Sequence, residues 1–200
     1  DCILAAGTLP LGHNHSIINE CLKKFSLNNY PVQTMDIPTE LQYDFLNSLY
    51  NFLPYNISLD YKIQMCSPSG SDSIESAIKL AKISTQNNTI LTFTGGYHGQ
   101  SYGSSSISGK VRNSFKYSGM SDVHFLPYPN NYSNLSTLQI NQYINDLLLN
   151  NQSGISKPAA IIFESIQGEG GVNIPTKELI QNLRKITYQQ NIPLIADEVQ

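Results

Sequence analysis

The sequence predicts an α/β domain built on a mostly parallel sheet with flanking helices. Short, uninterrupted apolar runs at 159–163 and 192–196 are typical of strands buried on both faces. They alternate along the chain with segments that have the period of amphipathic helices, and this alternation favours parallel strand order. The chain has 200 residues, 40% of them hydrophobic, enough for one such domain or for part of a larger one.

Two helices are expected in the first quarter of the chain. Residues 16–25 and 39–53 both carry apolar side chains at helical spacing, and Pro54 ends the second helix. The rest of residues 1–37 reads as irregular, and residues 63–66 are a short strand candidate.

Alternating strands and helices are expected after residue 66. A turn at 67–71 precedes a helix that reaches Ala81, and Asp72 and Glu75 have capping-box spacing at its start. Strands are predicted at 90–93 and 123–126, with a loop at 95–99 and a tract of small residues at 103–109 between them. A loop at 128–132, a helix at 140–149 and a loop at 167–171 follow. Thr176 is expected to cap a last helix, whose inner face reaches Ile186, before the strand at 192–196.

Composition and charge exclude several classes of protein. The net charge is −3 and there is no basic stripe, so nucleic acid is not an expected partner. No apolar run is long enough to span a membrane, and no signal peptide opens the chain. Three cysteines without a CxxC pair indicate free thiols in a reducing cytoplasm, and His13 and His15 lack a third ligand for a metal.

Four local patterns could carry chemistry. Ser69-Gly70-Ser71 opens a helix, where free N–H groups, a close backbone approach and two hydroxyls suit a phosphate group, although an ordinary capped helix explains the same residues. Tyr97 and His98 follow a strand, where an aromatic ring could stack on a planar ligand. A surface tyrosine and a solvated histidine are the alternative.

The other two patterns are acidic. Glu164 and Asp197 each end a buried strand, the place where open α/β sheets bind ligands. A buried carboxylate there is costly unless it has a cationic partner, and a pyridinium nitrogen would be such a partner for Asp197. A salt bridge to a lysine or arginine, or capping of a helix start, is the alternative. Glu169 lies among three glycines in the loop 167–171, which either turns tightly near a ligand or is a flexible connection.

These motifs stand in the order in which the class III (ω-) aminotransferases carry them. The series Leu11-Gly12-His13, Ser69 to Ala81, Gly96-Tyr97-His98-Gly99, Phe163 to Val172 and Ile195 to Gln200 resembles that family over essentially the whole chain. Pro68 and Leu126-Pro127-Tyr128-Pro129 resemble its diaminobutyrate–2-oxoglutarate branch. The resemblance implies that the chain is part of a pyridoxal-phosphate enzyme of fold type I. Residues 1–37 would be part of the small domain, and residues 38–200 the cofactor-binding large domain, incomplete at the C-terminus and ending before the Schiff-base lysine.

The resemblance also implies a role for each matching residue. Ser69, Gly70 and Ser71 would bind the phosphate of pyridoxal 5'-phosphate, and Tyr97 would stack on its ring with His98 beside it. Asp197 would pair with the protonated ring nitrogen and Gln200 would approach the ring hydroxyl. Glu164 would lie near Asp197, and Glu169 would be the gating acid that pairs with an arginine and frees it for the second substrate.

The implied activity is transfer of an amino group between a diamine-type amino acid, such as 2,4-diaminobutyrate, and 2-oxoglutarate, in a cytoplasmic homodimer. Lys177 and Lys185 precede Asp197 on an expected helix, so neither takes the part of the Schiff-base lysine. The 200 residues are therefore expected to be a piece of a longer protein and inactive alone. Two alternatives stay open: a truncated, non-catalytic remnant, and another class III activity such as an ornithine or 4-aminobutyrate aminotransferase, an aminomutase or an epimerase.

Overall fold

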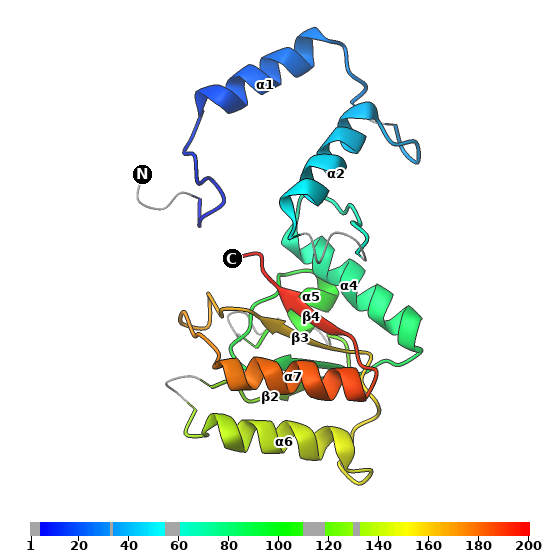
Figure 1. The fold of residues 1–200 in the computed structure, drawn as a ribbon, viewed down its shortest axis with the longest axis vertical. Helices are drawn as coiled ribbons and strands as arrows, with labels where there is room; N and C mark the ends of the chain where they lie inside the picture. The colour runs from blue at the N-terminus through cyan, green and yellow to red at the C-terminus, as the bar shows by residue number, and fades with distance from the viewer. Residues whose placement is uncertain (1–4, 33, 55–60, 110–118, 130–132) are drawn as a thin grey trace. The chain divides into compact units, whose positions relative to one another are not determined.

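The structure is a computed structural model that describes residues 5–32, 34–54, 61–109, 119–129 and 133–200 (Figure 1). The chain divides into two compact units, Asp1–Met65 and Cys66–Gln200. The predicted domain division between residues 37 and 38 is not tested by these two units and stays a prediction.

The described residues of the first unit include the amphipathic helices α1 (Ser16–Leu27) and α2 (Glu40–Phe52), so both expected helices are confirmed. The His15 side chain caps α1 by accepting a hydrogen bond from the Ile17 amide at 3.4 Å, which is a structural role for this histidine. Thr39 caps α2 in the same way. Neither helix buries a residue in the described structure, so their apolar faces remain exposed.

The prediction of a strand at 63–66 is wrong, because these residues form no strand in the structure. Instead, the Ile63 amide donates a hydrogen bond to the Tyr50 hydroxyl, which itself donates to the Tyr61 carbonyl. A side chain of α2 therefore takes the place of a neighbouring strand.

The second unit is built on four parallel strands, which confirms the predicted sheet. They are β1 (Ile90–Phe93), β2 (Val123–Leu126), β3 (Ala160–Glu164) and β4 (Leu194–Asp197), in the order β2-β1-β3-β4. The register places Glu164 beside Asp197 at the carboxyl ends of β3 and β4. Both acidic side chains therefore reach the same edge of the sheet.

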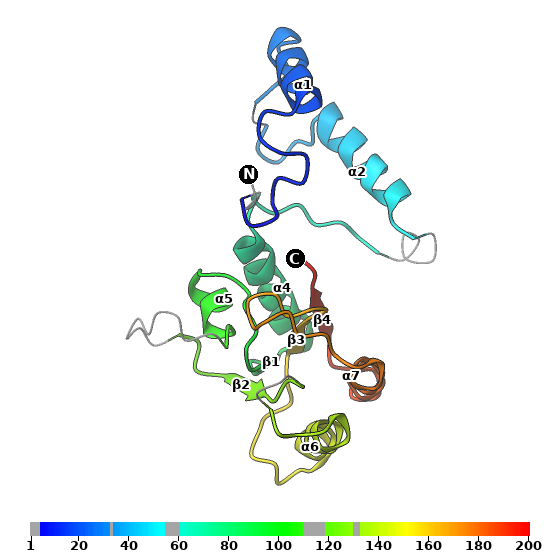
Figure 2. The same ribbon diagram turned by 90° about the vertical axis from the view of Figure 1, so that its left-hand side faces the viewer.

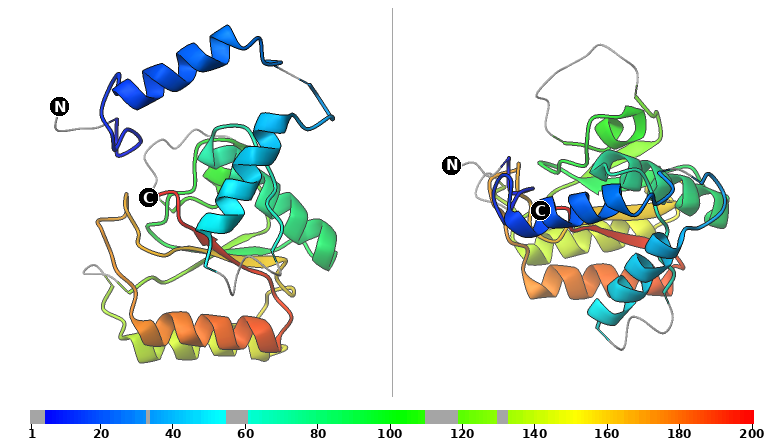
Figure 3. Two further views of the ribbon diagram at one scale, coloured as in Figure 1. Left: turned by 45° about the horizontal axis from the view of Figure 1, so that its top comes forward. Right: turned by 90° about the horizontal axis from the view of Figure 1, so that it is seen from above.

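Four helices cover the two faces of this sheet: α4 (Gly70–Thr85), α5 (Tyr102–Ser106), α6 (Thr137–Leu149) and α7 (Lys177–Gln189). Figures 2 and 3 show α4 and α5 on one face and α6 and α7 side by side on the other. Successive side chains of each strand point to opposite faces of the sheet. Leu91 and Phe163 point into the core under α6 and α7, whereas Ile90 and Ile162 pack against α4.

Two details of the helices differ from the prediction. The helix that starts at Gly70 has Ser69 as its N-cap, and no side chain caps it, so the capping box expected from Asp72 and Glu75 is wrong. The small-residue tract contains the short helix α5, which was not predicted. Asp72 accepts a hydrogen bond from the Ser67 hydroxyl, and the Glu75 carboxylate accepts hydrogen bonds from the start of α5, so neither acid serves its own helix start.

Thr176 caps α7 as predicted, accepting a hydrogen bond from the Leu179 amide at 3.3 Å. Cys21 is exposed and Cys66 is half-buried, and both are free thiols, while Cys2 lies outside the described residues. Among the helices that the structure describes, none has the length and apolar character needed to cross a membrane.

Candidate functional site

One pocket of about 190 Å³ lies where the carboxyl ends of β1, β3 and β4 meet the start of α4. All eight residues predicted to bind a cofactor line this pocket, although they come from four separate segments of the chain. Three further residues that were not predicted complete its wall. The lining residues are Ser69, Gly70, Ser71, Tyr97, His98, Gly99, Glu164, Ile166, Asp197, Val199 and Gln200.

The start of α4 lines one part of the pocket and is chemically suited to an anion. The Ser69 side chain makes no hydrogen bond to the first-turn amides of α4, so it does not cap the helix. The helix dipole favours a negative charge at this end of α4. Gly99 has φ +121°, and a Cβ at this position would overlap the Ser71 hydroxyl. The loop that follows β1 therefore needs a glycine at position 99 in order to approach Ser71 closely. The loop and the start of α4 together enclose a position suited to phosphate.

A buried acid–histidine pair forms the opposite end of the pocket. His98 Nδ1 lies 2.8 Å from Asp197 Oδ2, and the two residues are only 4% and 9% exposed. The Val199 amide donates to the other oxygen of Asp197 at 3.2 Å. His98 Nε2 lies 3.4 Å from the Thr92 hydroxyl, so both ring nitrogens of the histidine have a neighbour that fixes the ring.

Glu164 is the second buried carboxyl of the site. Its Oε2 accepts a hydrogen bond from the Tyr97 amide at 3.0 Å, and its Oε1 accepts one from the Gly168 amide at 3.4 Å. Burial raises the pKa of Glu164 above its ordinary value, with the Asp197 carboxylate adding to the effect, while these two bonds and His98 oppose it. Burial and the nearby Glu164 also raise the pKa of Tyr128 above its ordinary range.

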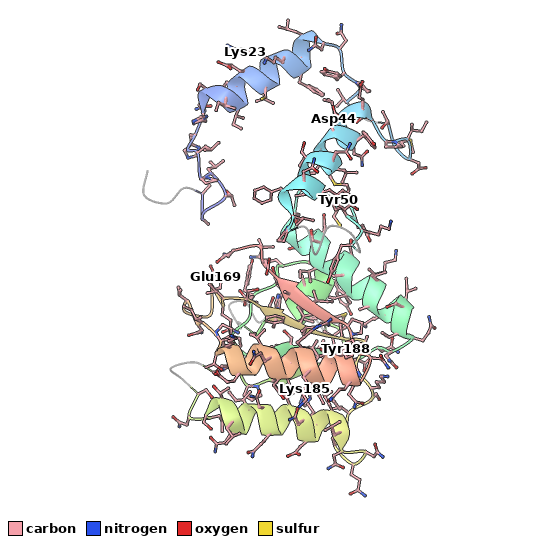
Figure 4. The ribbon with its side chains drawn as sticks, viewed as in Figure 1. Lys23, Asp44, Tyr50, Glu169, Lys185 and Tyr188 are labelled. Atoms are coloured by element: carbon pink, nitrogen blue, oxygen red, sulfur yellow. The ribbon has the colours of Figure 1, made fainter. Side chains whose placement is uncertain are left out.

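The loop that carries Glu169 is held by a polar cluster. Gln167 and Asn173 exchange two backbone hydrogen bonds of 3.0 Å, and the Asn173 side chain donates to Gln167 Oε1 and to the Gly170 carbonyl. The loop is therefore closed at its base and is not a flexible connection. Glu169 is exposed and does not line the pocket (Figure 4).

The pocket can bind a planar ligand that carries an anionic group at one end and a cationic nitrogen at the other. Tyr97 and Val199 offer an aromatic and an aliphatic surface between the two ends. No lysine lines the pocket among the described residues. Lys177 and Lys185 lie exposed on α7, as expected from the sequence, and Figure 4 labels Lys185 there.

The pocket thus combines the carboxyl ends of parallel strands, a helix start suited to an anion and a buried aspartate. The family model described as aminotransferase class-III matches residues 1–200, and the chain belongs to this family.

Curated relatives of the chain have names that agree on one reaction. The chain is 38% identical to a diaminobutyrate–2-oxoglutarate aminotransferase of Rhizobium meliloti and 37% identical to one of Haemophilus influenzae. All of this chain is covered in both cases, but only 44% and 45% of the relatives. The chain thus spans a little under half the length of the relatives it matches.

Solved structures agree with this fold. An amine transaminase from an uncultivated Pseudomonas species, solved in its PLP-bound form, is similar with a TM-score of 0.76 and 26% identity, over 94% of this chain and 45% of that protein. An ω-aminotransferase from Paracoccus denitrificans has the same fold, with a TM-score of 0.71 and 21% identity, over 92% of this chain and 42% of that one.

Three pocket residues were missed because the sequence gives them no chemical signature. Ile166 and Val199 are apolar residues in loops, and only their position next to predicted residues relates them to the site. Gly99 belongs to the motif Gly96-Tyr97-His98-Gly99, and the motif alone gives this glycine no role. Its place beside a histidine after a strand was the one available signal.

Proposed function

We propose that the complete protein is a pyridoxal-phosphate-dependent aminotransferase that moves an amino group between 2,4-diaminobutyrate and 2-oxoglutarate. The observation that carries the proposal is the buried Asp197 carboxylate in the same pocket as the uncapped start of α4. The names of the curated relatives support the two substrates.

The residues present fit this cofactor. Its phosphate suits the α4 start, where Gly70 and the hydroxyls of Ser69 and Ser71 can donate hydrogen bonds. Its ring nitrogen suits Asp197, since a buried carboxylate is stabilised by a cationic partner. The ring between these ends would lie against Tyr97.

The bound cofactor would supply an electron sink for a carbanion formed on the substrate. The chain's own residues prepare this chemistry. His98 orients Asp197 by a 2.8 Å hydrogen bond, so the carboxylate has a fixed direction and would stabilise a proton on the ring nitrogen of the bound cofactor. Glu164 fixes the backbone of Tyr97, and Gln200 would approach the ring hydroxyl.

The remaining parts of the proposal concern the complete enzyme. Glu169 would gate an arginine that binds the second substrate's carboxylate, and a lysine from outside these 200 residues would act as the base. The enzyme would be a cytoplasmic homodimer in which residues 1–37 belong to the small domain and residues 38–200 to the large domain.

The test uses the complete protein expressed from its gene. Wild type should form glutamate from 2-oxoglutarate and 2,4-diaminobutyrate and should bind pyridoxal phosphate. Asp197→Ala should abolish turnover and weaken cofactor binding, whereas Asp146→Ala, a change of the same type on α6 away from the pocket, should leave both unchanged. Near-normal turnover in Asp197→Ala would refute the role of this residue.

A further inference from the structure

Glu75 makes a set of hydrogen bonds that the proposed function does not use. It lies on α4, outside the pocket lining, and its Oε1 accepts three hydrogen bonds from the start of α5. The donors are the Ser101 hydroxyl at 2.5 Å and the amides of Gly103 and Ser104 at 2.6 and 3.1 Å. One oxygen atom thus holds four consecutive residues against α4.

The fit between Glu75 and α5 is close. A Cβ on Gly103 would overlap the Glu75 carboxylate, so a side chain at this position would displace that carboxylate. Ser71, one turn earlier on the same face of α4, accepts a hydrogen bond from the Gln100 amide at 3.2 Å. Ser71 and Glu75 therefore hold the segment 100–104 at two successive points.

This segment is connected to the pocket through hydrogen bonds. The His98 amide donates to the Ser108 hydroxyl at 2.9 Å, and that hydroxyl donates to the Ser104 carbonyl at 2.8 Å. The Ser104 amide in turn donates to Glu75. A displacement of α5 would therefore be transmitted to the backbone of His98 and to Tyr97 beside it.

We propose that Glu75 is a positioning residue for the cofactor site, which fixes Tyr97 and His98 by holding residues 101–104 on α4. The inference rests on the proposed function for its ligand, but the anchor itself is a property of the fold. A carboxylate suits this position because hydrogen bonds to a charged acceptor are stronger than those to a neutral one.

The test compares Glu75→Ala, Glu75→Gln and wild type as complete proteins. Glu75→Ala should weaken pyridoxal-phosphate binding by on the order of tenfold, because Tyr97 and His98 would no longer be held before binding, and ordering such side chains on binding costs about this factor. At saturating cofactor, the circular dichroism of the bound cofactor should change, since the side chains around the ring would no longer be fixed. Glu75→Gln keeps an acceptor oxygen and should show a smaller loss.

Two measurements separate this proposal from its alternatives. Amide hydrogen exchange at Gly103 and Ser104 should be faster in Glu75→Ala, whether or not any cofactor is present. Glu178→Ala, which removes an exposed acid from the first turn of α7, is the matched control and should leave affinity, dichroism and exchange as in wild type.

The proposal is overturned if Glu75→Ala keeps the wild-type affinity and dichroism, because α5 could then move without disturbing the site. Unchanged exchange would also overturn it, by showing no anchor in solution. If Glu75→Ala does not fold, Gly103→Ala supplies the same test from the other side, since its methyl group displaces the carboxylate. A wild type that binds no pyridoxal phosphate contradicts the proposed function, while the exchange rates still report on the anchor.

Discussion

Replacement of His98 by alanine tests how much this residue stabilises the buried Asp197 carboxylate in the pocket. The imidazole Nδ1 lies 2.8 Å from Asp197 Oδ2, and the side chains of the two residues are 1% and 6% exposed. In His98→Ala the carboxylate stays buried and loses this partner. Its other oxygen keeps the Val199 amide at 3.2 Å.

The expected cost follows from these contacts. Losing a hydrogen bond to a charged group costs about 1.5–3 kcal/mol. Leaving one member of a buried pair uncompensated costs about 3–5 kcal/mol. Because Asp197 retains the Val199 amide and faces the pocket, the free energy of unfolding should fall by about 3 kcal/mol, near the low end of the second range.

The assay is equilibrium unfolding of the complete protein in urea, at neutral pH, without cofactor and at one protein concentration. Far-ultraviolet circular dichroism, which follows the loss of the helices, is the probe. The midpoint should fall by the lost free energy divided by the measured urea dependence, on the order of 1 M. The control is His124→Ala, since the half-buried His124 contacts the Tyr143 hydroxyl at 3.2 Å and its loss should cost about 0.5–1.5 kcal/mol.

The double variant His98→Ala/Asp197→Ala provides the refutation. If the two residues stabilise one another, the double variant should lose less than the sum of the single losses. Strictly additive losses would show that the pair does not interact in solution. A His98→Ala cost no larger than that of His124→Ala would refute the reasoning from burial.

Three further predictions test other parts of the site. Burial raises the pKa of Glu164 above its ordinary value of 4.5, so the stability that its protonation adds is complete at low pH and is lost as the pH rises through the native pKa. In urea titrations Glu164→Gln should therefore lose less stability than wild type as the pH rises above about 4.5, and parallel curves would contradict this. Gly99→Ala should weaken pyridoxal-phosphate binding in a fluorescence titration, because the new Cβ would overlap the Ser71 side chain. Gly154→Ala is the control, since Gly154 also has a positive φ but lies in open space, and it should not weaken binding. Equal affinities of the two variants would count against the close approach of Gly99 to Ser71. Asn173→Ala should lower the free energy of unfolding by about 2 kcal/mol, because two side-chain hydrogen bonds at a buried position are lost. A change below about 0.5 kcal/mol would show that the loop 167–171 does not depend on these two hydrogen bonds.

The sheet and most of the helices could be predicted because their signals are local. The apolar runs of β3 and β4 and the helical periods of α6 and α7 are properties of consecutive residues. The failures have tertiary causes. Residues 63–66 are apolar enough for a strand, but the Tyr50 hydroxyl binds the Ile63 amide. Nothing in the local sequence reports that contact.

The site could be predicted to the extent that parallel strands end at one edge of a sheet. That rule and the order of the motifs brought eight residues to one pocket. The role of Glu75 could not be predicted in this way, because capping-box spacing and a bond to a distant helix use the same residue type at the same position. Only the fold decides which donor a carboxylate on a helix meets.

The arrangement of charges explains why these particular residues share one pocket. The α4 start favours an anion, whereas the carboxylates of Glu164 and Asp197 lie side by side in register at the ends of β3 and β4. Two buried carboxyl groups so close repel one another, and the Glu164 pKa rises in part for this reason. His98 hydrogen-bonds Asp197, while Glu164 is bound by two backbone amides, so the two acids have different roles. The acid that the histidine orients is the one suited to a cationic ring nitrogen, and the other holds the loop that surrounds it.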